Sequence, residues 1–179
     1  MEQTLHLPQK SRGAPRAAGL LSGLSAFVAA LAHRIALPLT VAPVAGHAIY
    51  LTSPKRPNVA RVAQLRSKNL QVAVTSDLTV IDRAAREFSF SRLICIIQAD
   101  DFGDLDDLIE HLITLRQCNP AVEVILVSRK VNRHDFSAER LAICDVTLQY
   151  PYTSSDLDEA LISAHHNNLA WRKRTRLLQ

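Results

Sequence analysis

Strand-like and helix-like segments alternate along most of this 179-residue chain. The run at residues 92–98, RLICIIQ, is almost continuously apolar, which is typical of a strand covered on both faces. β-branched and aromatic residues mark five such runs, at residues 47–53, 70–76, 92–98, 122–128 and 145–150. Strands that alternate with helices form parallel sheets joined by right-handed crossovers. The pattern therefore predicts an α/β fold with residues 92–98 as its central strand.

Each predicted strand is followed by a segment with apolar residues at helical spacing. The longest pattern begins at Leu105 and ends before Pro120. The pattern after the fourth strand is weaker and predicts a short helix near residues 136–143. Ser154 or Ser155 can cap the last helix, whose predicted buried stripe is Leu157, Ala160, Leu161 and Ala164. Five strand–helix pairs predict a three-layer α/β/α domain over residues 47–171.

Residues 1–46 have a different character and are treated as a separate region, a flexible basic arm followed by an apolar helix. The apolar stretch at residues 19–32 places Leu20, Leu24, Phe27 and Leu31 at the spacing of one helical face. This favours an N-terminal helix that packs on the domain or pairs with a second copy. The same stretch ends in Ala30-Leu31-Ala32, so a secretory signal peptide and an organellar transit peptide remain alternatives. It is too short for stable insertion into a membrane.

The charge is unevenly distributed. Residues 1–46 carry +3 and residues 172–179 carry +4, so the total of +4 leaves −3 on residues 47–171. The C-terminal charge comes from four residues predicted to form a basic tail, namely Arg172, Lys173, Arg174 and Arg176. Such a cluster could displace counterions from phosphates, which makes nucleic acid an alternative partner. A solvated tail is the simpler interpretation, because aromatic residues do not interleave the cations.

Cysteine and glycine usage limits the chemistry that the sequence can support. Cys95, Cys118 and Cys144 are odd in number and lack zinc-site spacing, which indicates a reducing compartment and hence the cytoplasm. The chain has 5 glycines, and no glycine-rich phosphate loop follows the first predicted strand. We therefore expect no metal, no cofactor, no catalytic residues and no enzymatic activity.

The segment at residues 93–161 resembles the second half of a bacterial receiver domain, the phospho-accepting part of two-component response regulators. Asp100 follows the third strand, Leu115-Arg116 ends the next helix, and Pro120 precedes a β-branched strand that ends at Ser128. Tyr150-Pro151 stands where the family has Lys-Pro after the fifth strand. The resemblance implies a five-stranded parallel sheet in the order 2-1-3-4-5. It also makes Asp100 the acceptor-like residue.

The departures from the family fall on its phosphorylation chemistry. The acidic pair that ends the first strand in receivers aligns with Thr52 and Ser53, whose hydroxyls cannot replace two carboxylates as magnesium ligands. The family's lysine aligns with Tyr150, which carries no permanent positive charge. Ser128 retains the expected hydroxyl. Together with Asp101 and Pro151, these residues form a predicted degenerate receiver pocket.

The sequence predicts a non-catalytic, receiver-like signalling protein that acts by binding another signalling or regulatory protein, without magnesium-dependent phosphorylation. A homodimer and a role in signal transduction or transcription are expected. Two alternatives remain. One is a response regulator in which Asp100 still accepts phosphate, and the other is a DNA-binding regulator that uses the basic C-terminal tail.

Overall fold

A computed structural model of the chain describes residues 46–56, 59–88 and 91–177. The predicted N-terminal arm and helix lie outside these residues. Five strands form one parallel sheet in the order β2-β1-β3-β4-β5. The strands are β1 (Gly46–Leu51), β2 (Leu70–Thr75), β3 (Leu93–Gln98), β4 (Glu123–Ser128) and β5 (Val146–Gln149). The predicted fold class and strand order are therefore confirmed.

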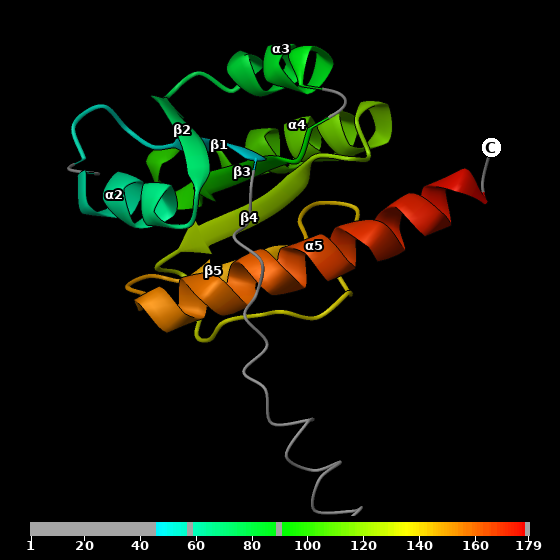
Figure 1. Cartoon of the computed structure of the whole chain (residues 1–179). Coiled ribbons are helices and arrows are strands. Elements are labelled where there is room, and N and C mark those ends of the chain that lie inside the picture. The colour runs from blue at the N-terminus through cyan, green and yellow to red at the C-terminus, as the bar shows by residue number, and fades with distance from the viewer. Residues whose placement is uncertain (1–45, 57–58, 89–90, 178–179) are drawn as a thin grey trace, which may run out of the picture. The chain divides into compact units, whose positions relative to one another are not determined.

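Helices cover both faces of the sheet (Figure 1). They are α2 (Val59–Ser67), α3 (Thr79–Glu87), α4 (Leu105–Cys118) and α5 (Ser154–Arg176), and a short 3₁₀ helix, η1 (Ala99–Asp101), follows β3. Apolar side chains of α3 and α4 pack on one face, and those of α2 and α5 pack on the other. The result is the predicted three-layer α/β/α arrangement.

The sheet is centred on β3, as its apolar sequence predicts. Every residue of β3 and of β4 is buried, whereas β2 at the edge is largely exposed. Side chains alternate between the two faces, so Ile94 and Ile96 belong to the core beneath α5, and Cys95 and Ile97 belong to the core beneath α4. Burial on both faces explains why this strand lacks the polar alternation of a half-exposed strand.

The predicted helix near residues 136–143 is wrong, because this segment forms turns and irregular backbone instead. Asp135 and Thr147 exchange two backbone hydrogen bonds of 2.8 and 2.9 Å in an antiparallel bridge. The side chain of Asn167 donates to the carbonyls of Phe136 and Asp145, at 3.0 and 2.7 Å. These long-range bonds bind backbone groups at both ends of the segment and replace the bonds that a helix would supply.

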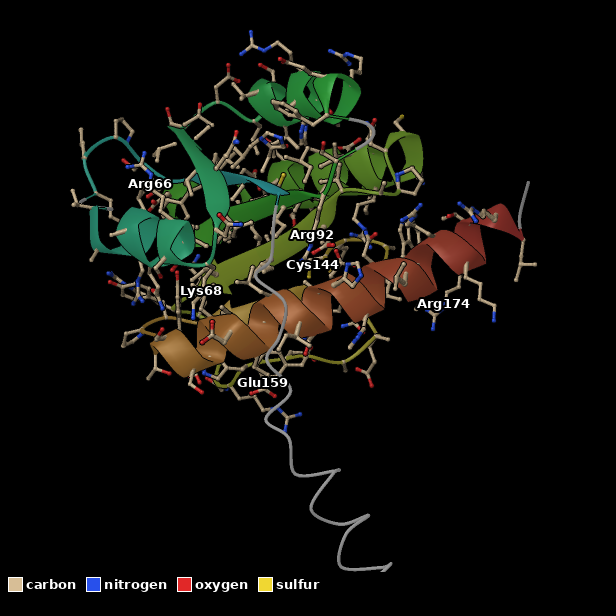
Figure 2. All side chains as sticks on the ribbon, in the orientation of Figure 1. Arg66, Lys68, Arg92, Cys144, Glu159 and Arg174 are labelled. Carbon is tan, nitrogen blue, oxygen red and sulfur yellow. The ribbon has the colours of Figure 1, made fainter. Side chains whose placement is uncertain are left out.

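The final helix α5 is longer than its buried stripe. Leu157, Ala160, Leu161 and Ala164 are all buried, as predicted. Thr153 caps the helix in a reciprocal arrangement with Asp156. Beyond the stripe the helix continues past the sheet, and Arg174 projects from this part (Figure 2). The predicted boundary at residue 172 therefore falls inside α5, and the four basic residues belong to the helix.

Candidate functional site

The predicted site residues gather at the carboxyl end of the parallel sheet. Thr52 and Ser53 follow β1, Asp100 and Asp101 lie in η1 after β3, and Ser128 ends β4. The strands β1 and β3 are neighbours in the sheet. The chain leaves β1 toward β2 on one side and leaves β3 toward β4 on the other. Ligands of open α/β sheets bind at such a switch point. The fold thus places the two aspartates at the same end of the sheet as Thr52 and Ser53.

Asp101 binds the residues that the resemblance aligns with the acidic pair of a receiver. The Thr52 hydroxyl and the Ser53 N–H both donate to Oδ2 of Asp101, at 2.8 and 2.9 Å. Nη2 of Arg56 lies 2.5 Å from Oδ1, and the Asp101 side chain is only 3% exposed. Both carboxylate oxygens are therefore engaged by the protein itself, and a guanidinium supplies the positive charge.

Asp100 is engaged from the other side by the end of β4. The Ser128 hydroxyl donates to Oδ1 at 2.7 Å, and the Arg129 N–H donates to Oδ2 at 2.7 Å. Ser128 Oγ also accepts a hydrogen bond from the Lys130 N–H at 3.0 Å. Asp100 is half-buried, and none of the groups that bind Asp101 donates a hydrogen bond to it. The two adjacent aspartates consequently serve different strands, with Asp101 binding the β1 loop and Asp100 binding the β4 loop.

Tyr150 follows β5 at the same carboxyl end of the sheet. The Tyr150–Pro151 peptide bond is cis. The guanidinium of Arg129 lies 4.9 Å from the centre of the Tyr150 ring, a cation–π distance. Tyr152, two residues on, is buried and meets Tyr150 edge-on. Tyr150 is partly exposed, so it stands at the surface next to the site.

A buried polar pair connects β1 and β3 near their carboxyl ends. Nε2 of Gln98 donates to the Tyr50 hydroxyl at 3.0 Å, and Oε1 of Gln98 has no hydrogen-bond partner among the described residues. Burial raises the pKa of the Tyr50 hydroxyl, which therefore stays protonated at neutral pH. Both members of this pair are neutral groups, so the pair adds no carboxylate to this end of the sheet.

The residues present do not fit a magnesium ion. Magnesium prefers carboxylate oxygens and water in octahedral geometry, but Thr52 and Ser53 provide a hydroxyl and an amide that point their protons at Asp101. Nη1 of Arg56 is buried without a hydrogen-bond partner among the described residues, which adds a positive charge where a cation would bind. Among residues 46–56, 59–88 and 91–177, no group of three or more His, Cys, Asp or Glu side chains is arranged to hold a metal.

Two residues of the site were not predicted from the sequence. Arg56 lies in the loop after β1, and Arg129 lies in the loop after β4. Both loops also carry other basic residues, Lys55 and Lys130, so the local sequence does not single out the arginine that binds an aspartate. Each arginine contacts its aspartate because two strands that are far apart in the chain are neighbours in the sheet.

The predicted basic residues are remote from this pocket in sequence and form a separate group on the last turns of α5. Lys173, Arg174 and Arg176 are exposed, and Arg172 is partly buried. No described helix is long and apolar enough to cross a bilayer.

Comparison with solved structures identifies the class of fold. NtrX from Brucella abortus, solved in complex with ADP, matches with a TM-score of 0.52 and 14% identity. The match covers 74% of this chain and 29% of NtrX, so the chain spans less than a third of that protein. A response regulator from Thermotoga maritima matches with a TM-score of 0.49 and 11% identity, over 68% of this chain and 98% of that chain.

A pilus assembly-related protein from Burkholderia pseudomallei matches with a TM-score of 0.48 and 18% identity, over 70% of this chain and 92% of that chain. No family model and no curated protein matches the sequence. At these identities the comparisons define the fold alone. The strand order is the one that the resemblance to receivers implies, and the NtrX match shows that this chain shares a fold with part of that protein.

Proposed function

We propose that this chain is a signalling module of the receiver type that acts by binding another protein, without magnesium-dependent phosphorylation of Asp100. The observation that carries the proposal is the Arg56–Asp101 ion pair, together with the Thr52 and Ser53 bonds to the same carboxylate. A receiver needs free carboxylate oxygens at this end of the sheet to hold a metal that clamps the phosphoryl group. In this chain both oxygens of Asp101 are bound by other groups of the protein instead.

The absence of a lysine at the end of β5 supports the same proposal. Tyr150 occupies that position, and the guanidinium of Arg129 lies over its ring. A phosphorylated Asp100 would therefore lack the lysine that a receiver provides from this position, where the neutral phenol of Tyr150 stands instead. Phosphorylation would also have to break the Asp100 bonds to Ser128 and Arg129.

The surface around Tyr150 and α5 is the proposed contact region for a partner. Tyr150 is partly exposed, and the apolar side chains of Ile162 and Leu169 on α5 are 37% and 47% exposed. The two residues are seven positions apart and so lie on nearly the same side of the helix. A homodimer formed through α5 stays a prediction, and so does the identity of any other partner.

Magnesium is expected to leave the thermal stability of the protein unchanged. A ligand present at a hundred times its Kd adds about 2.7 kcal/mol to the free energy of unfolding, which would raise the Tm by several degrees. Thermal unfolding with and without millimolar MgCl₂ measures this directly. The triple variant Thr52→Asp/Ser53→Asp/Arg56→Ala serves as a matched control, because it restores the acidic pair and removes the competing guanidinium. A magnesium-dependent rise in Tm of the unaltered protein would contradict the proposal.

Duplex DNA is a second candidate partner, favoured by the position of the basic cluster on the exposed end of α5. Neutralising four phosphates predicts that the logarithm of the binding constant falls with the logarithm of salt concentration with a slope of about −3 to −4. Salt titrations of binding to duplex DNA check the slope. If changing all four cations to glutamine leaves the affinity unchanged, this candidate is excluded.

A further inference from the structure

A pocket of about 430 Å³ lies between α4 and the segment that joins β4 to β5. Leu126 of β4 and Thr147 of β5 are partners in adjacent strands and line it from the sheet. Leu105 and Ile109 line it from α4, and Ile143 lines it from the joining segment. The pocket is within the roughly 300–1,000 Å³ range of small-molecule sites, and its lining is mainly apolar.

The pocket exists because residues 129–145 do not form a helix. A helix between β4 and β5 would cover this face of the sheet, next to α4. Instead the Asp135–Thr147 bridge and the Asn167 bonds to Phe136 and Asp145 hold the segment in an irregular path. Leu105 at the start of α4 is consequently 45% exposed.

Charge at the pocket favours an anionic ligand. Two basic side chains and one acidic side chain line the pocket, which gives its lining a net charge of +1. Lys130 and Arg140 line the pocket and are both exposed. Arg140 lies 3.6 Å from Asp135, so part of its charge is shared, whereas the described residues form no ion pair with Lys130. Asp100 also lines the pocket, but its two oxygens accept hydrogen bonds from Ser128 and Arg129.

We propose that this pocket binds a small organic anion with an apolar body, such as an arylalkyl carboxylate. The apolar part would lie against Leu126 and Ile109, and the carboxylate would face Lys130 and Arg140. Binding of this kind goes beyond the proposed partner binding and does not depend on it. Because Asp100 and Ser128 line the pocket, an occupied pocket would contact the same residues that form the candidate site.

The test uses two probes of nearly equal shape, phenylbutyrate and its uncharged amide, titrated into the full chain while amide resonances are followed by NMR. Saturable shifts are expected at Leu105, Ile109, Val131 and Thr147, with no response at Leu161 on the opposite face of the sheet. The carboxylate is expected to bind about 5-fold more tightly than the amide, which is the upper range for exposed ion pairs.

Variants separate the two parts of the proposal. Lys130→Glu/Arg140→Glu is expected to remove the preference for the carboxylate and leave binding of the amide unchanged. Arg83→Glu, an exposed cation on α3 that does not line the pocket, is the matched charge control and should change neither affinity. Leu105→Trp and Ile109→Trp, tested separately, should each weaken both probes about 10-fold or more by filling the pocket, and well-dispersed spectra verify folding.

Three results would overturn the proposal. They are shifts that fail to saturate, shifts centred outside the pocket, and equal binding of the two probes in the unaltered protein. The last result would reject the anionic ligand class even if the pocket binds apolar molecules.

Discussion

Replacing Arg116 by methionine is expected to lower the free energy of unfolding by about 3 to 5 kcal/mol, because it leaves a buried carboxylate without its counter-charge. The side chains of Arg116 and Asp145 are both fully buried. Nη1 and Nη2 of Arg116 donate to the two oxygens of Asp145 at 2.6 and 2.8 Å. Burial raises the pKa of Asp145, while the guanidinium and the Val124 N–H act in the opposite direction. Denaturant unfolding measured by circular dichroism gives the change.

Two further variants show whether the effect comes from the unpaired charge. Arg86→Met removes an exposed arginine from α3 and is expected to change stability by no more than about 0.5 kcal/mol. The double variant Arg116→Met/Asp145→Leu removes both charges and should recover part of the loss, since apolar replacement of a whole buried pair is often tolerated. A loss below about 1 kcal/mol for Arg116→Met alone would show that this pair is not a principal stabilising contact.

Asp101→Ala is expected to destabilise the domain by about 2 to 3 kcal/mol, and Asp100→Ala by only about 1 kcal/mol. Asp101 is almost fully buried and its loss leaves Arg56, 24% exposed, without a carboxylate. It also removes the acceptor of the Thr52 and Ser53 hydrogen bonds. The described residues form no ion pair with Asp100, and its hydrogen bond from the Arg129 N–H is exposed, so that donor can bind water instead. Denaturant unfolding of the two variants measures the difference.

The comparison of the two aspartates has a matched control in Asp107→Ala. Asp107 is an exposed residue in the first turn of α4, and its loss should cost no more than about 0.5 kcal/mol. If Asp100→Ala proves as destabilising as Asp101→Ala, the two carboxylates do not have the separate structural roles that their contacts indicate.

The sequence was sufficient to predict the sheet because the relevant signal is local. The apolar run of β3 and the stripe of α5 each report burial over a few neighbouring residues, and both predictions are confirmed. The helix near residues 136–143 was predicted from a weak local pattern and is wrong. Its path depends on contacts with Asn167 and Thr147, which are distant in the sequence and close only in the folded chain.

The sequence predicted only part of the candidate site, without Arg56 and Arg129, and none of its bonding. The family resemblance placed Thr52, Ser53 and Asp100 together, and the structure places them at one end of the sheet. Asp101 was predicted as a member of the pocket but not as the residue that makes its ion pair. Nothing in the sequence near Arg56 marks it as the partner, because the partner lies 45 positions away. Such pairings follow from strand order, which a single sequence does not encode locally.

The most direct test of the central claim is the intact mass of the protein after incubation with acetyl phosphate and magnesium. Because the carboxylates of the site are bound by Arg56, Ser128 and neighbouring groups, no added phosphoryl group is expected. A conventional receiver domain treated in parallel shows that the reagent is active. A mass increase of one phosphoryl group that disappears in Asp100→Asn would contradict the claim and assign this chain to the phosphorylated response regulators.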